Sequence, residues 1–450
     1  MPDRSVKFSP HGSFPLKSSE NLAIAFDIGT TTLAASLVNF RTGERLGRAG
    51  ALNPQREFGA DVISRLQAAC ESTEILQKMT RMVNAELQRL AMDLLDGADA
   101  GPAQLHYVAM AGNPAMEHLL LGLPVRNLAY PPFRPLFTAG KKINSSELGW
   151  DTATEAFIFP LPGGFVGGDL VAFLYGIYPG GSPHSRTDAS QCASTPQPAT
   201  LFLDLGTNAE IALEAGERIF ATSAAAGPAL EGGNLACGMA ALPGAISRVK
   251  ITGEKVITST IGNSQPAGIC GSGVIEAVVE LLDAGVIEAS GRLRAPQEIA
   301  TNLANRIREV DGEWAFVLHQ DARCKIYLSQ QDIREVQLAK SALRAGMEIL
   351  FQRAGITVDD VQQVVLTGSF GAELSAESLK RIGIFTGKMV HMTGFIREGV
   401  LAGVEKVLCS RQGPADVDRL AQLIRVVPLS GTPAFEKLFF EQMNFPETEK

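Results

Sequence analysis

The sequence predicts an α/β protein built from two similar lobes. Three observations support this: strands alternate with helices, the order of elements in the first half returns in the second, and one acidic hairpin motif occurs in both halves. The motif reads FDIGTTTL from Phe26 and LDLGTNAE from Leu203. In each copy a buried-strand pattern reaches Asp, followed by an apolar residue, Gly-Thr and a second strand pattern.

The first lobe is predicted over residues 21–198, after a disordered leader over 1–20. Its Pro-rich stretch around 124–160 predicts an irregular insert, and the Ser/Pro/Thr-rich segment 180–198 predicts a linker. The other predicted elements, in order, are a hairpin over 22–39, a third strand after the Thr42-Gly43 turn, helices over 59–72 and 75–95, a strand, Gly-Asn-Pro turn and helix over 105–123, and a glycine loop entering a helix over 163–177.

The second lobe is predicted over residues 199–450. Its order of strands and helices repeats that of the first lobe, and it ends in an amphipathic helix. Its predicted elements, in order, are a hairpin over 199–213, a glycine loop opening a helix over 268–285, a long helix over 330–355, a buried strand with a Gly-Ser-Phe-Gly turn over 361–371, a helix over 375–383 and the final helix over 433–445.

Composition excludes several classes of function. The 450 residues are 45% hydrophobic and carry a net charge of -8 without any Lys/Arg-rich run, so we expect neither a nucleic-acid nor an anionic-membrane surface. No apolar run is long enough for a membrane span, and residues 1–20 have no signal-peptide core, which predicts a cytoplasmic protein. The six cysteines are scattered without a C-x-x-C, which predicts reduced thiols and no iron–sulfur cluster.

The hairpin motif has the chemistry of a phosphate and metal site. Glycine allows backbone N–H groups to approach a ligand, and threonine hydroxyls donate to phosphate oxygens. The carboxylates of Asp27 and Asp204 would hold Mg²⁺, mostly through water. One copy alone is better explained as a tight turn, but two copies in matching contexts favour a nucleotide bound from both sides. The predicted nucleotide-binding residues are Gly29, Thr30 and Thr31 in the first copy and Gly206 and Thr207 in the second.

Two further segments complete the predicted site. The turn in VVLTGSFG, taken alone, is better explained as a plain strand-to-helix turn. Because it follows the second hairpin by about 160 residues, it also fits an adenosine site, where Gly368 and Gly371 would let the backbone approach the nucleoside. Asp169, at a helix start after a glycine pair, would orient the water that attacks the γ-phosphate, or would only complement the helix dipole. Asp169 and Asp204 are the candidate catalytic acids.

Together DIGTTT, DLGTN and VVLTGSFG resemble the phosphate and adenosine motifs of the acetate and sugar kinase, heat-shock chaperone and actin superfamily. That resemblance implies two ribonuclease-H-like lobes around an ATP cleft. Longer segments resemble the C-terminal domain of reductive activators of corrinoid proteins, among them ALNPQREFGADVISRL, SAAAGPALEGGNLACGMAALPGAI and EVQLAKSALRAGMEIL.

The family resemblance implies an ATPase that drives reduction of an inactive Co(II) corrinoid to Co(I) on a methyltransferase partner. It also implies that Asn208 joins the second phosphate-binding set and that Ser369 lies beside the adenosine. Family members carry an N-terminal ferredoxin-like domain, a linker and a middle domain. We expect this chain to lack all three, so a separate ferredoxin-like donor would supply the electrons to the corrinoid protein or its methyltransferase.

Three other functions stay open on the sequence. The first is a small-molecule kinase that uses Asp169 as the base for a hydroxyl acceptor. A second is an activator in which Cys237 and Cys270 share a cluster across a homodimer, and a third is a nucleotide-binding regulator that does not hydrolyse ATP.

Overall fold

A computed structural model describes residues 21–178, 199–368 and 374–447 of the chain. The predicted leader and linker therefore lie outside the described residues. Among the described residues, no helix is long and apolar enough to cross a bilayer.

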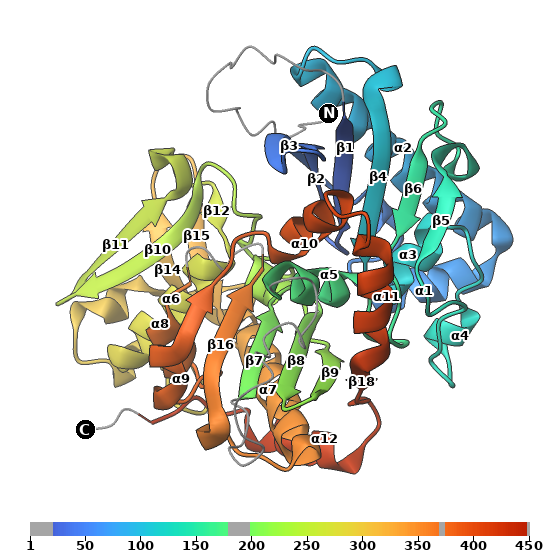
Figure 1. The fold of residues 1–450 in the computed structure, drawn as a ribbon. Helices are drawn as coiled ribbons and strands as arrows, with labels where there is room; N and C mark the ends of the chain where they lie inside the picture. Colours follow the sequence, from blue (N-terminus) through green and yellow to red (C-terminus); the bar gives the residue numbers. More distant parts are fainter. Residues whose placement is uncertain (1–20, 179–198, 369–373, 448–450) are drawn as a thin grey trace. The chain divides into compact units, whose positions relative to one another are not determined.

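The first six-stranded sheet has the order β3-β2-β1-β4-β6-β5 (Figure 1). Its strands are β1 (Leu22–Ile28), β2 (Thr32–Asn39), β3 (Glu44–Leu52), β4 (Leu105–Gly112), β5 (Lys141–Asn144) and β6 (Glu155–Ile158). Strand β1 pairs antiparallel with β2 and parallel with β4. All but one residue of β1 are buried, as a central strand covered on both faces requires.

Helices flank this sheet. They are α1 (Val62–Glu71), α2 (Thr73–Gly97), α3 (Pro114–Leu120), α4 (Arg126–Ala129) and α5 (Gly168–Ile177), with short 3-10 helices η1 (Pro54–Phe58), η2 (Pro102–Gln104) and η3 (Ser145–Leu148). Helix α2 begins because the Ser72 hydroxyl accepts a hydrogen bond from the Ile75 backbone N–H. Its buried residues Met79, Val83, Leu87 and Leu90 recur every three or four positions and form one apolar face.

The second six-stranded sheet has the order β17-β16-β7-β8-β9-β18. Its strands are β7 (Ala199–Asp204), β8 (Ala209–Ala215), β9 (Arg218–Ala224), β16 (Val361–Thr367), β17 (Thr393–Phe395) and β18 (Ile424–Val426). Strand β7 pairs antiparallel with β8 and parallel with β16. The strand orders β3-β2-β1-β4-β6 and β9-β8-β7-β16-β17 therefore correspond position by position, which confirms the predicted repeat.

Two three-stranded sheets, β11-β10-β12 and β13-β14-β15, accompany the second repeat. Their strands are β10 (Ala245–Thr252), β11 (Lys255–Thr260), β12 (Gly268–Ile269), β13 (Ile307–Val310), β14 (Glu313–Gln320) and β15 (Lys325–Ser329). The later helices are α6 (Gly271–Asp283), α7 (Gln330–Ala354), α8 (Ala376–Arg381), α9 (Gly387–Met392), α10 (Gly399–Leu408), α11 (Gly413–Leu423) and α12 (Pro433–Glu441), with 3-10 helices η6 (Pro228–Glu231), η7 (Ile261–Asn263), η8 (Pro296–Glu298), η9 (Asn302–Arg306) and η10 (Val358–Asp360).

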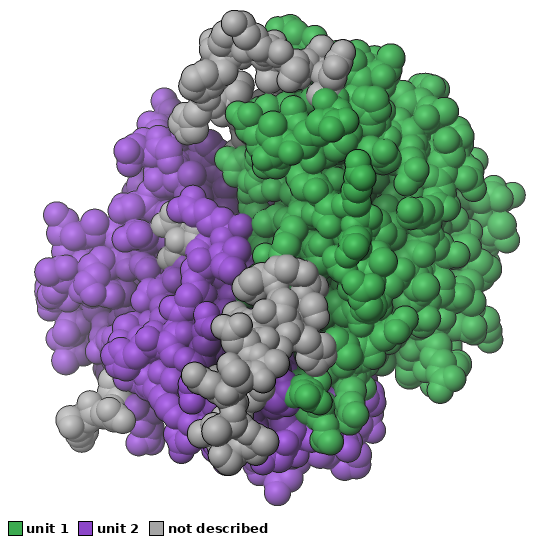
Figure 2. Space-filling model, in the orientation of Figure 1, with its two compact units in different colours: residues 1–196, 217–221, 398–426 green, residues 197–216, 222–397, 427–450 purple. Residues whose placement is uncertain are grey.

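The chain forms two compact units (Figure 2). Unit 1 takes residues 1–196, 217–221 and 398–426, and unit 2 takes the remainder. This division differs from the predicted single cut near residue 198. The physical reason in the case of 398–426 is that α10 packs on β1, β4 and α5, all of which belong to unit 1.

The stretch around 124–160 is more regular than predicted. Strands β5 and β6 pair antiparallel with each other, and β6 adds to the sheet parallel to β4. Each strand has only four residues, so no periodicity marks it in the sequence. Pairing of β6 with β4, which is distant in sequence, and of β5 with β6 supplies the hydrogen-bond partners that stabilise these short strands.

Candidate functional site

The first acidic hairpin lies in unit 1 at the end of the central strand. Asp27 is the partly exposed residue of β1, and the loop to β2 contains Gly29, Thr30 and Thr31. A Cβ on Gly29 would lie 2.5 Å from the backbone oxygen of Thr32, so the turn is too tight for a side chain. Its backbone is thus available for close approach to a ligand.

Two buried asparagines brace this loop, and the sequence reading did not single them out. Asn53 Nδ2 donates to the backbone oxygen of Gly29 at 2.9 Å, and its backbone N–H donates to that of Thr31 at 2.9 Å. Asn113 Nδ2 donates to Thr30 Oγ1 at 3.0 Å. Each asparagine precedes a proline and caps a helix, so the Asn-Pro pairs were the available signal.

Asp169 lies next to a second carboxylate that the sequence reading also missed. The side chain of Glu117, in α3, is buried, and its Oε1 accepts from the Gly112 backbone N–H at 3.2 Å. Glu117 Oε2 is buried without a hydrogen-bond partner among the described residues. A Cβ on Gly168 would lie 2.4 Å from Glu117 Oε1, so the glycine pair before the helix leaves room for the two acids.

Burial changes the acidity of both carboxyl groups. Desolvation raises the pKa of Asp169 to about 6, against the opposing effect of the hydrogen bond that its Oδ1 accepts from the Leu170 N–H at 2.8 Å. Desolvation, and then the charge of Asp169, raise the pKa of Glu117 well above its usual range. A carboxyl group with a pKa near neutrality can accept and release a proton under physiological conditions.

The second acidic hairpin lies in unit 2. Asp204 ends β7 and pairs across the sheet with Glu210 in β8 and Thr367 in β16. The Leu205 N–H donates to the Thr367 backbone oxygen at 3.1 Å. Gly368 adopts a φ of +134°, and a Cβ there would lie 2.4 Å from the backbone oxygen of Leu205. The first glycine of the predicted adenosine motif therefore packs directly on the second hairpin.

Two further carboxylate side chains, Glu210 and Glu231, belong to the surroundings of the second hairpin. Thr207 Oγ1 donates to Glu231 Oε2, and a Cβ on Gly206 would lie 3.2 Å from the Asn208 backbone oxygen and 3.8 Å from Glu231 Oε1. Glu210 is buried, and its Oε1 accepts from Ser223 Oγ at 3.2 Å. Oxygen ligands of this kind fit a hydrated Mg²⁺, which prefers carboxylates and retained waters.

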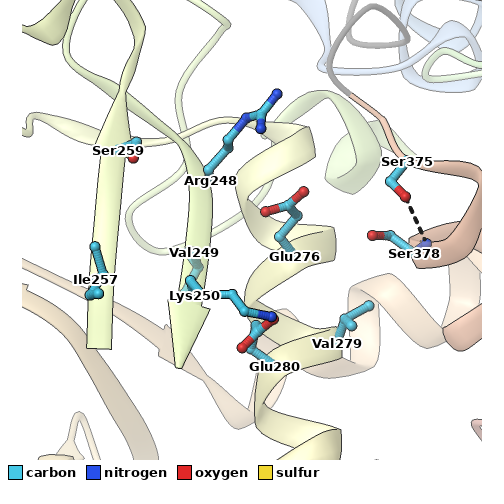
Figure 3. Close-up of a pocket in the computed structure, with 10 residues that line it drawn as sticks. All are labelled: Arg248, Val249, Lys250, Ile257, Ser259, Glu276, Val279, Glu280, Ser375 and Ser378. Atoms are coloured by element: carbon cyan, nitrogen blue, oxygen red, sulfur yellow. Dashed lines mark hydrogen bonds and ion pairs between the residues drawn. The ribbon is translucent and has the colours of Figure 1, made fainter. Parts of the chain in front are cut away.

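A pocket of about 350 Å³ lies in unit 2, between β10, α6 and the start of α8 (Figure 3). Arg248 and Lys250 line it from β10, Glu276 and Glu280 from α6, and Ser375 is the cap of α8. Lys250 Nζ and Glu280 Oε1 form an ion pair at 2.8 Å. Burial raises the pKa of Glu276. This size lies in the usual range for small-molecule sites.

The predicted adenosine motif lies just before one of the pocket-lining residues along the chain. Gly368 is described, whereas Ser369 and Gly371 lie outside the described residues. Ser375, which lines the pocket, follows a few residues later. The sequence analysis predicts no site residue among 248–280, and the structure brings these residues to the pocket from β10 and α6.

The structure thus forms two sets of predicted residues, one in each unit. Unit 1 contains the Asp27 loop and the acid Asp169. The residues before Asp169 pack closely on the end of β4, because a Cβ on Gly167 would lie 2.4 Å from the Gly112 backbone oxygen. Unit 2 contains the Asp204 loop and Gly368. Two sheets of ribonuclease-H-like order, each with an Asp-x-Gly-Thr hairpin after its central strand, define an actin-like ATPase fold.

The chain belongs to the RACo family. Residues 198–450 match the family model described as the C-terminal domain of RACo, the ASKHA domain, and residues 22–177 match the RACo middle region. The expectation that this chain lacks the middle domain is therefore wrong, because the first lobe is that region. It was mistaken for part of the C-terminal domain because both regions carry the same hairpin and strand order.

Three relatives extend this result. The chain is 29% identical to the corrinoid activation enzyme RamQ of Eubacterium limosum, over 98% of this chain and 73% of the relative. It is 26% identical to the [Co(II) methylated amine-specific corrinoid protein] reductase of Methanosarcina barkeri, over 86% and 69%. A solved reductive activator for a corrinoid, iron–sulfur protein superposes with a TM-score of 0.85 at 28% identity, covering 96% of this chain and 67% of that chain.

Proposed function

We propose that the protein binds and hydrolyses ATP and uses this reaction to drive reductive activation of a corrinoid protein. The observation that supports this most strongly is the repeated hairpin: each of two corresponding sheets ends its central strand near a carboxylate followed by a tight Gly-Thr loop. Membership of the RACo family supports the same proposal.

The side chains have distinct proposed roles. Thr30, Thr31 and the backbone around Gly29 bind phosphate oxygens, with Thr207 and the backbone around Gly206 and Asn208 as the second set. Asp27 and Asp204 hold Mg²⁺ largely through water. When bound, the metal neutralises phosphate charge.

Asp169 accepts a proton from the attacking water, because its raised pKa of about 6 suits a general base near neutral pH. Glu117 is a positioning residue, since its Oε1 accepts a hydrogen bond from the Gly112 N–H and lies beside Gly168, the residue before Asp169. The pocket lined by Arg248 and Glu276 receives the nucleoside. Gly368, Ser369 and Gly371 keep the adenosine-binding role that the sequence predicts for them.

The proposed partner is a corrinoid protein or its methyltransferase in the cytoplasm, with electrons from a separate ferredoxin-like donor. The names of the relatives support this, because both curated relatives are described as acting in corrinoid activation or reduction. A homodimer, which the sequence analysis allows, stays a prediction.

The test is ATP turnover measured with and without a Co(II) corrinoid protein under anaerobic conditions, together with the corrinoid absorbance spectrum. We expect turnover to rise on addition of the partner, and the Co(I) spectrum to develop only with ATP and a donor. Asp204→Asn should abolish both effects. Asp359→Asn is the matched control, because its side chain is 82% exposed and Asp359 pairs only with Lys388 Nζ at 3.6 Å among its described ion pairs.

Two outcomes would contradict the proposal. Turnover that is unchanged across several corrinoid partners would argue against activation. Transfer of the labelled γ-phosphate to a metabolite, rather than to free phosphate, would support a small-molecule kinase instead, with Asp169 as the base for the acceptor hydroxyl.

A further inference from the structure

Three side chains able to bind a metal meet at the turn between β14 and β15 in unit 2. They are His319, Asp321 and Cys324, and one ligand atom from each lies within 4.8 Å of the others. His319 Nε2 is 3.3 Å from Asp321 Oδ2. His319 has no second histidine at helical spacing, but the turn of a hairpin brings ligands together at other spacings.

The backbone holds this arrangement in place. The pairing of β14 with β15 shifts register between Val317 and His319, and an irregularity of this kind re-aims the side chains beyond it. Asp321 Oδ1 accepts from the Arg323 and Cys324 backbone N–H groups at 2.7 and 2.8 Å, so the turn is fixed by its own aspartate. Asp321 Oδ2 points to the histidine, where a cation would also bind.

The surroundings leave the ligand atoms accessible. The side chains of His319 and Asp321 are 25% and 36% exposed. Cys324 Sγ donates to the Pro266 backbone oxygen at 3.2 Å, which orients the sulfur without a covalent partner. The nearest cation along the chain, Arg323, is occupied elsewhere, because its Nη1 donates to Gln265 Oε1 at 2.6 Å.

We propose that His319, Asp321 and Cys324 form a Zn²⁺ site, with a water molecule as the fourth ligand. Imidazole nitrogen, carboxylate oxygen and thiolate sulfur are the three ligand types that Zn²⁺ takes in proteins, whereas Mg²⁺ and Ca²⁺ prefer oxygen alone. Binding replaces the thiol proton of Cys324, which is released to solvent, with a metal–sulfur bond. The site shares no residue with the proposed nucleotide site, so either proposal can fail without the other.

The experiment is Zn²⁺ titration of the chelator-treated full chain by isothermal calorimetry, repeated with Co²⁺ in an absorbance spectrometer. We expect one Zn²⁺ per chain, and at least about tenfold weaker binding in Cys324→Ser and in His319→Gln. The Co²⁺ complex should show a thiolate-to-cobalt charge-transfer band that Cys324→Ser removes.

The matched controls are Cys409→Ser, which changes another accessible cysteine, and Asp311→Asn, which changes the exposed aspartate between β13 and β14 of the same sheet. Both should bind Zn²⁺ like the parent protein. Absence of stoichiometric Zn²⁺ binding would overturn the proposal, and so would binding that neither Cys324→Ser nor His319→Gln weakens. Circular dichroism establishes that each variant is folded; should one variant fail to fold, the other still decides the question.

Discussion

Replacing Asp169 by Asn should stabilise the protein at neutral pH and at the same time strongly reduce its ATPase activity. Folded Asp169 keeps its proton up to about pH 6, while the unfolded side chain loses it near the usual value of 3.8. Between these pH values the folded state binds more protons than the unfolded state. The free energy of unfolding of the parent protein therefore falls as pH rises through this window.

The magnitude follows from the size of the shift. A difference of about 2 pKa units corresponds to about 3 kcal/mol once the pH is above both values. Asn cannot ionise, and its Oδ1 can still accept the hydrogen bond from the Leu170 N–H. We expect Asp169→Asn to exceed the parent in stability by less than about 1 kcal/mol at pH 4 and by about 3 kcal/mol at pH 7.

The assay is denaturant unfolding followed by tryptophan fluorescence in a Trp314→Phe background. The chain has 2 tryptophans, so this change leaves Trp150 as the sole fluorescent reporter. Trp150 is buried and belongs, like Asp169, to unit 1. In the same samples ATP turnover should fall on the order of 100-fold or more if Asp169 is the base. A stability difference that does not change with pH, or a variant less stable than the parent at pH 7, would refute the reasoning.

Two structural predictions accompany this one. Gly403→Ala would put a Cβ 1.7 Å from the Ala172 backbone oxygen, so we expect the free energy of unfolding to fall by about 1–3 kcal/mol. Gly97→Ala, whose Cβ would meet nothing within 4 Å, should raise the free energy of unfolding by about 0.5–1 kcal/mol. The thermal midpoint should therefore fall in the first variant and rise in the second. Asn113→Ala removes a helix cap and the hydrogen bond to Thr30 Oγ1, so it should lower the free energy of unfolding by about 1–2 kcal/mol and weaken binding of a non-hydrolysable ATP analogue. Unchanged affinity for the analogue would show that the hydrogen bond to Thr30 is not needed for nucleotide binding.

The local elements of the fold could be predicted because their signals are local. The hairpin strands, the long helices and the Asn-Pro helix starts each depend on residues within one segment. Strands β5 and β6 could not be predicted, since four residues carry no periodicity. Strand β6 is stabilised by pairing with the distant strand β4, and β5 by pairing with β6. Likewise no local pattern shows that α10 packs with β1 of unit 1.

The same distinction holds for the candidate site. Asp27 and Asp204 were found because Asp, Gly and Thr stand together in one short motif. Glu117 was missed, because only the folded chain brings α3 against the glycine loop before α5. The acidity of Asp169 depends on this burial and has no signature in the sequence.

The central claim is that one magnesium nucleotide needs the carboxylates of both hairpins. The most direct measurement is calorimetric binding of a non-hydrolysable ATP analogue with Mg²⁺ to the parent, Asp27→Asn, Asp204→Asn and the double variant. The account predicts one nucleotide per chain, weaker binding in each single variant, and a loss in the double variant that differs from the sum of the single losses. Two nucleotides per chain, or a single variant that binds like the parent, would contradict it.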